Sequence, residues 1–150
     1  MAGGNLEFDR RSIRQLAQNL EVVRTRALEG ASEAMFAFSE AVLDRSLGEI
    51  PRNTGTAAST VYVTPATEQS GGEELKSAFG YAGPETDLRN PESGDMVSEY
   101  IVDIHEGIGL TLQSGKTKFL EDPLNASRGE FIDALVYGVA AALEGVGFSD

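Results

Sequence analysis

The hydrophobic positions in the first third of the chain recur at three- and four-residue spacing. This stripe covers residues 13–47, and Asp9 stands just before it as a candidate N-cap. Gly30 interrupts the stripe, and a glycine inside a helix costs about 1 kcal/mol relative to alanine. The pattern predicts two helices or one bent helix, with the bend between Leu20 and Gly30. The helical stretch must end before Pro51.

After this stripe the hydrophobic period changes from helical spacing to two. Residues 60–64 are rich in β-branched side chains and predict a strand, and residues 75–81 predict its return strand across a hairpin loop at 65–72. Alternation over residues 97–104 predicts a third strand. The polar segment 83–95, with its prolines and carboxylates, is expected to be a mobile loop. Residues 5–8 are expected to add a short edge strand.

A second helical stripe occupies the last quarter of the chain. It runs from Leu124 to Leu143, begins close to Pro123 and is followed by Gly145. The predicted fold is therefore of the α+β class, with a small antiparallel sheet covered on one face by the long N-terminal helix, bent or split, and by this C-terminal helix. We expect a single domain over residues 1–150, with mobile loops near 65–72, 83–95 and 107–118. At least one edge of so small a sheet is free to pair with a partner.

Net charge is more informative for this chain than length or composition. The 150 residues carry a formal net charge of −12, and the acidic residues are dense between Glu68 and Glu106. DNA binding depends on Lys and Arg that neutralise phosphates, so direct affinity for nucleic acid is not expected. The absence of cysteine excludes disulfides, thiolate zinc sites and a cysteine nucleophile. No apolar run has the roughly 20 residues that a membrane span needs, so no membrane partner is expected.

Candidate chemistry is sparse. His105 is the only histidine and precedes Glu106, which would allow a general base next to a carboxylate. On the predicted strand, however, neighbouring side chains point to opposite faces, so we favour a structural or interface histidine over a catalytic pair. Gly107-Ile108-Gly109 lacks the third glycine of a dinucleotide loop. Residues 114–117 match the end of a phosphate-binding loop, but Leu110 stands at the earlier position where such a loop needs glycine. We expect no enzymatic activity, no cofactor and no metal.

Three short motifs, in order along the chain, carry a resemblance to a known family. A long helix ends in Pro before Thr-Gly and a strand, a tyrosine-rich strand ends in Glu-Gly, and Phe-Leu precedes Pro and a last helix. This order resembles the tailed-phage neck proteins described as head-tail joining, tail completion or tail-terminator-like. Lys118 stands where the family has proline, and 56–58 replaces its leucine and basic residue. The matching residues, expected to be fold determinants, are Pro51, Thr54, Gly55, Tyr100, Glu106, Gly107, Phe119, Leu120 and Pro123.

The resemblance implies a structural virion protein. It implies a homo-oligomeric ring, commonly a hexamer, that terminates the tail tube and joins it to the neck, with DNA passing through the lumen as non-specific cargo. The implied partners are further copies of the chain, the tail tube protein and a head-completion or stopper protein. The implied location is the head-tail junction of the virion, after assembly in the host cytoplasm. Another non-enzymatic role, such as head completion, a minor capsid component or an interaction module, remains the alternative.

The same reasoning nominates charged residues for the interface or the lumen. A surface that repels DNA would let it slide through a channel, whereas a basic lining would retain it. Two of the candidates are lysines of the segment 107–118, which is called the connector. The candidates are Glu68, Glu73, Glu74, Glu85, Asp87, Glu92, Asp95, Lys116 and Lys118.

Overall fold

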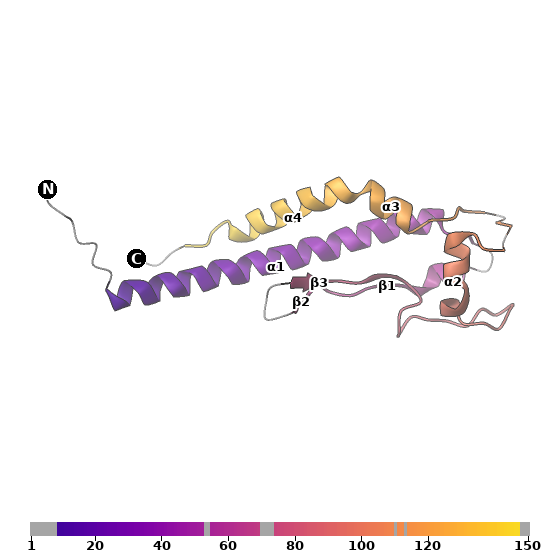
Figure 1. The fold of residues 1–150 in the computed structure, drawn as a ribbon, viewed down its shortest axis with the longest axis horizontal. Helices are drawn as coiled ribbons and strands as arrows, with labels where there is room; N and C mark the ends of the chain where they lie inside the picture. The colour runs from indigo at the N-terminus through magenta and orange to yellow at the C-terminus, as the bar shows by residue number, and fades with distance from the viewer. Residues whose placement is uncertain (1–8, 53–54, 70–73, 110, 113, 148–150) are drawn as a thin grey trace.

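The computed structural model describes residues 9–52, 55–69, 74–109, 111–112 and 114–147. The expected strand at residues 5–8, the motif residue Thr54 and the candidate Glu73 lie outside these ranges. The α+β class is confirmed: a long N-terminal helix packs on a small antiparallel set of strands and on a C-terminal helix (Figure 1). The elements in chain order are α1 (Arg10–Glu49), η1 (Ala57–Thr60), β1 (Val61–Val63), β2 (Thr67–Gln69), β3 (Glu74–Lys76), β4 (Phe79–Tyr81), α2 (Val97–Glu106), α3 (Glu121–Ala126) and α4 (Arg128–Leu143).

The helix α1 is one continuous element of 40 residues, so of the two predicted alternatives the pair of separate helices is excluded. At a rise of about 1.5 Å per residue it is roughly 60 Å long. Asp9 caps it as expected, since its carboxylate accepts hydrogen bonds from the backbone N–H groups of Arg11 at 2.6 Å and Ser12 at 2.9 Å. Ile50 leaves the helical region with ψ of 135°, as a residue before proline should.

The helices α1 and α4 pack closely where two glycines face each other. A Cβ on Gly30 would lie 2.4 Å from the carbonyl oxygen of Gly138, and a Cβ on Gly138 would lie 2.7 Å from that of Gly30. Gly30 therefore marks the point where the two helix backbones approach each other, and it does not interrupt α1. Beyond this point Phe38 and Phe131 pack with their ring centroids 4.8 Å apart.

The strands form one irregular hairpin along α1. β1 pairs with β4, Val61 opposite Tyr81, and β2 pairs with β3, Thr67 opposite Lys76. Three residues, 64–66, lie opposite two residues, 77–78, and one extra residue on one strand is the pattern of a β-bulge. The strands predicted at 60–64 and 75–81 are found, but β2 occupies part of the segment predicted as the hairpin loop.

The third predicted strand is wrong, because residues 97–106 form the helix α2. Val97, Ile101 and Ile104 pack toward the core at helical spacing, whereas Val102 on the other side is 63% exposed. The β-branched residues favour a strand by intrinsic preference, but burial of the helical face decides the outcome. The carboxylate of Glu99 accepts a hydrogen bond from the Met96 N–H at 2.8 Å and holds the first turn.

The acidic segment before α2 forms hydrogen-bonded turns. The Asp87 N–H donates to the Gly83 carbonyl at 2.9 Å, and the Asn90 N–H donates to the Asp95 carbonyl at 2.8 Å. The Asp87 carboxylate also accepts from the Ser98 N–H at 3.0 Å, at the start of α2. The segment is therefore tied into the fold, and its predicted mobility stays a prediction.

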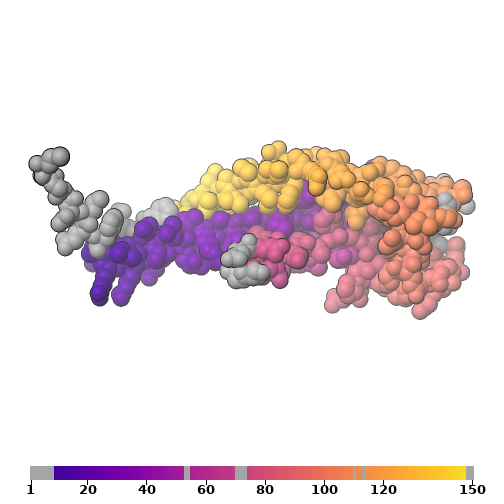
Figure 2. Space-filling view, viewed as in Figure 1, coloured from indigo at the N-terminus to yellow at the C-terminus, as the bar shows by residue number. Residues whose placement is uncertain are grey.

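The buried core lies at one end of the molecule. Ile50, Ala57, Val97 and Phe119 form its centre, where the end of α1 meets η1, α2 and the start of α3. The rest of the molecule is the pair α1–α4, with the hairpin on the other side of α1 (Figure 1). The shape is elongated, and the N-terminal part of α1 extends past α4 (Figure 2).

The expected C-terminal helix is divided into two. α3 ends at Ala126, α4 begins at Arg128, and the buried Ser127 lies between them. Arg45 of α1 donates to the Ser127 hydroxyl and, at 2.8 Å, to the Glu130 carboxylate. Pro123 occupies the first turn of α3 as predicted, and it is buried.

Candidate functional site

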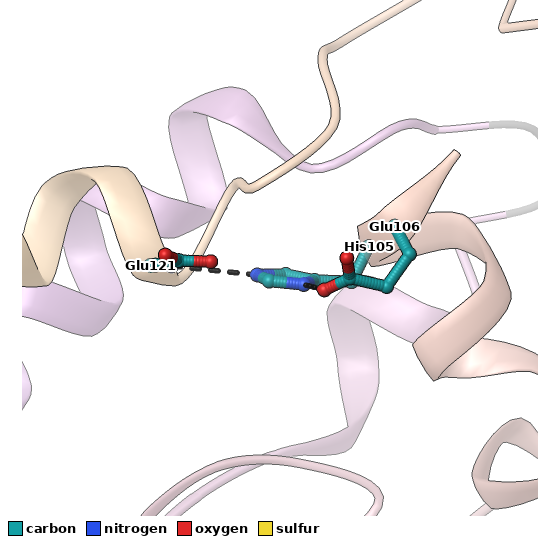
Figure 3. A group of neighbouring side chains, drawn as sticks. All are labelled: His105, Glu106 and Glu121. Atoms are coloured by element: carbon teal, nitrogen blue, oxygen red, sulfur yellow. Dashed lines mark hydrogen bonds and ion pairs between the residues drawn. The ribbon is translucent and has the colours of Figure 1, made fainter. Parts of the chain in front are cut away.

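The densest cluster of polar side chains joins the end of α2 to the start of α3. Gly107 ends α2 with φ of 72°, a left-handed conformation that suits glycine. The chain returns so that the Lys118 N–H donates to the His105 carbonyl at 2.7 Å, and the Phe119 ring meets the His105 ring edge-on at a centroid distance of 5.0 Å. These contacts bring His105, Glu106 and Glu121 together (Figure 3).

Both ring nitrogens of His105 have partners within the chain. Nδ1 lies 2.9 Å from Glu106 Oε1, and Nε2 accepts the Glu121 N–H at 3.4 Å. This pattern fits the neutral tautomer with its proton on Nδ1. The prediction that His105 and Glu106 point to opposite faces is wrong, because it assumed a strand: adjacent side chains on a helix diverge by only about 100°.

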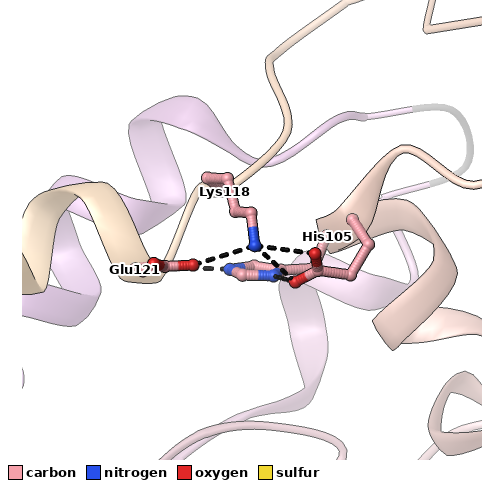
Figure 4. Close-up of polar contacts among 4 residues, drawn as sticks. His105, Lys118 and Glu121 are labelled. Atoms are coloured by element: carbon pink, nitrogen blue, oxygen red, sulfur yellow. Dashed lines mark hydrogen bonds and ion pairs between the residues drawn. The ribbon is translucent and has the colours of Figure 1, made fainter.

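Lys118 supplies the positive charge of this cluster. Its Nζ lies 2.6 Å from Glu106 Oε2 and 2.9 Å from Glu121 Oε2, between the two carboxylates (Figure 4). The hydrogen bond from Lys118 holds the pKa of the Glu106 carboxyl below its usual value, and the same contact raises the pKa of the Lys118 ammonium. Lys118 itself has φ of 57°, a backbone region more usual for glycine. We name His105, Glu106, Lys118 and Glu121 the clamp.

The clamp is chemically better suited to holding two elements together than to binding a metal. Ligand atoms of His105, Glu106 and Glu121 do lie within 4.8 Å of one another. The Lys118 ammonium, however, already lies beside both carboxylates, so a metal ion would have to displace it. Sequence reasoning missed this cluster because Glu121 and Lys118 are far from His105 in the chain.

Glu106 gives the clamp a testable pH dependence. Replacing Glu106 by Gln should destabilise the protein at neutral pH, and its difference from wild type should shrink as the pH falls below about 4.5. The folded-state pKa of Glu106 is depressed, so its stabilisation is present above the unfolded pKa and is lost as the pH falls through the folded pKa. Urea unfolding across an acid series measures the difference. Glu92→Gln, at an exposed turn, controls for the change in net charge, and an equal effect of both variants at neutral pH would refute the role of the clamp.

The described motif residues gather at the end of the molecule that holds the core. Phe119 and Pro123 are buried, and Leu120 packs against the core cluster. Tyr100 and Pro51 line a groove of about 340 Å³, together with Gly55, Arg52, Asp103 and Ile104. No sequence pattern indicates this groove. The residues are placed as fold determinants would be, and that role stays a prediction.

The acidic candidates do not form one surface. Glu68 and Glu74 lie on β2 and β3 along the middle of α1, and Glu68 pairs with Arg24 at 2.6 Å (Figure 1). Glu85, Glu92 and Asp95 are exposed in the turns before α2, far along the molecule. Asp87 pairs with Ser98, and hydrogen bonds from the Ser98 side chain and backbone N–H lower the pKa of the Asp87 carboxyl.

The two lysines of the connector are surrounded by carboxylates. Lys116 Nζ lies 3.1 Å from Glu49 and 3.5 Å from Asp122, and Lys118 lies in the clamp. Lys116 and Lys118 therefore do not form a basic patch separate from carboxylates. Their charges are neutralised within the chain, and they link the connector to α1 and α3.

The chain matches no family model, and no curated protein or solved structure is a match for it either. Within the part of the chain that the structure describes, no helix has the length and apolarity that crossing a membrane requires.

Proposed function

We propose that the protein is a structural subunit of a ring at the head-tail junction of a tailed phage. The ring terminates the tail tube, joins it to the neck and lets DNA pass through its lumen as non-specific cargo. The family part of this proposal rests on the motif resemblance. The assembly part rests on the exposed apolar surface of the two long helices.

That apolar surface is the observation that carries the proposal. On α1, Leu16 and Leu20 are each 59% exposed, and on α4 Val136 is 66% and Tyr137 is 77% exposed. Soluble monomers seldom leave aliphatic and aromatic side chains open along an entire helix face, and larger exposed patches mark interaction sites. The core at the other end of the molecule consists of apolar side chains that are at most 7% exposed, so exposure of apolar side chains is not general to this fold.

The charge of the chain is compatible with a DNA channel. The net charge of −12 disfavours tight adsorption of a phosphate backbone. The acidic residues on the hairpin and those before α2 lie at different places along the molecule, so the two groups can serve different contacts.

The test is assembly on the tail tube. Native mass spectrometry and negative-stain imaging of the purified protein, alone and with the tail tube protein of the same virion, should show closed rings at tube ends. A protein that stays a single subunit beside the tube would overturn the proposal. Rings or single copies that bind a capsid surface and leave the tube ends bare would favour the head-completion or minor-capsid role.

A further inference from the structure

We infer that the first part of α1 docks into a groove between α1 and α4 of a second copy of this chain. This inference deepens the proposed function, on which it rests for the identity of the partner. It names the contact that would join neighbouring subunits. Arg10–Val23 is called the projecting segment, and the space between α1 and α4 is called the helical groove.

Most side chains of the projecting segment are exposed. Gly30 lies against Ala142, close to the end of α4, so α1 continues for 20 more residues, or about 30 Å, beyond that contact. No side chain of the projecting segment is buried. Ile13, Leu16 and Leu20 nevertheless occur at i, i+3 and i+7 and lie on one face, which is the pattern of a helix that packs.

The helical groove is concave and lined mainly by small side chains, whereas the projecting segment presents large ones. It has a volume of about 620 Å³ and is lined on the α1 side by Ala34, Ala37 and Ala41, at i, i+3 and i+7. Ala134 and Ala141 line it on the α4 side. Small side chains leave room for larger ones from another helix, which is the way an amphipathic helix enters a groove. The three alanines of α1 and the three aliphatic residues of the projecting segment each span seven residues, about 10 Å.

The charges of the two surfaces are complementary as well. The projecting segment carries Arg10, Arg11 and Arg14 against the single carboxylate Glu21, although the whole chain is strongly acidic. The helical groove is lined by Glu33 and by Glu130, and Glu130 already pairs with Arg45 at 2.8 Å. An arginine on an entering helix would meet the Glu33 carboxylate at the rim, which favours this partner over an apolar segment of arbitrary charge.

The occupant must come from another copy. The projecting segment and one wall of the helical groove belong to the same continuous helix α1, so the segment cannot fold back into its own groove without breaking that helix. The contact joins two different surfaces and is therefore heterologous. Repeated from copy to copy, such a contact gives a ring where the rotation closes.

Two double variants test this contact. Leu16→Glu with Leu20→Glu damages only the projecting segment. Ala37→Arg with Ala141→Arg fills only the helical groove, at two exposed positions, with a residue that forms helices well. Each variant alone should be a single subunit by native mass spectrometry, whereas wild type assembles. An equimolar mixture should give complexes of two subunits and no larger species, because only one intact segment and one intact groove remain.

Native mass spectrometry also provides the control and the results that would contradict the inference. Val102→Ser removes an equally open aliphatic side chain from α2 and should assemble as wild type does. Circular dichroism of every variant should match wild type. The inference is overturned if either double variant assembles like wild type, if the mixture stays monomeric, or if wild type is itself a single subunit. Self-pairing of two projecting segments would instead leave the groove variant as a dimer.

The outcome separates this inference from the proposed function. Rings that cap tail tubes in both double variants would leave the proposed function standing and remove the docking contact. Dimers in the mixture, with a wild type that ignores the tube, would establish the contact and remove the role at the tail.

Discussion

Replacing Gly30 by alanine should lower the free energy of unfolding by about 1–3 kcal/mol, even though alanine is the better helix former. A Cβ at this position would lie 2.4 Å from the Gly138 carbonyl oxygen and 2.6 Å from the Ala142 Cβ. The nearest atom is backbone, so no change of rotamer can relieve the contact. α1 and α4 would have to separate, which would weaken packing along the pair. Urea unfolding followed by circular dichroism measures the loss.

Two other glycines in the same helices provide matched controls. A Cβ on Gly48 in α1 or on Gly129 in α4 meets nothing within 4 Å. Alanine at either site should leave stability unchanged or raise it by up to about 1 kcal/mol, since only helix propensity changes. Gly138→Ala should resemble Gly30→Ala because its Cβ would lie 2.8 Å from the Ala34 Cβ. Equal stabilities for Gly30→Ala and Gly48→Ala would refute the close approach of the helices.

Gly30 also shows where sequence reasoning reaches its limit. The hydrophobic spacing correctly predicted a helix over most of α1, the cap at Asp9 and the end before Pro51, because those features depend on neighbours in the chain. The cost of a glycine is likewise a local property, and it suggested a break. The cost of Gly30 is offset by the close helix packing against Gly138, which is more than a hundred residues away in the chain. No local sequence pattern contains that information.

The helix α2 was mispredicted for a related reason. Val97, Ile101 and Ile104 satisfy a helical face, whereas Tyr100, Val102 and Ile104 satisfy alternation. Both periods fit a segment of ten residues, so the core that buries one face decides. The same error hid the contact between His105 and Glu106 in the clamp, because their geometry was judged for a strand.

The two ends of the molecule have different physical characters. The end that holds the core uses large buried side chains, ion pairs and turns, and it contains every motif residue within the described ranges. The other end uses glycines and alanines to bring two helices together and leaves aliphatic side chains open. Stability and assembly can therefore be perturbed separately. A variant at the core end should act mainly on folding, and a variant in the projecting segment should act mainly on association.

Phe119→Ala should destabilise the protein by about 3–5 kcal/mol, the range for removing a buried aromatic ring. Phe119 is 1% exposed and meets two other rings edge-on, Tyr81 at 5.4 Å and His105 at 5.0 Å between centroids. These rings come from β4 and α2, and Phe119 itself leads into α3. Its removal would leave a cavity where three elements meet, and no one of them can close it by moving alone. Urea unfolding at neutral pH measures the loss.

A matched aromatic truncation separates burial from residue type. Tyr137→Ala removes a ring that is 77% exposed on α4, and it should change stability by no more than about 0.5 kcal/mol. Phe119→Leu keeps part of the apolar volume and should fall between the two. His105 loses its ring contact in Phe119→Ala, so the benefit that Glu106 gives through the clamp should weaken in that background. If Phe119→Ala were no less stable than Tyr137→Ala, the core would lie elsewhere, and the separation of a folding end from an assembling end would fail with it.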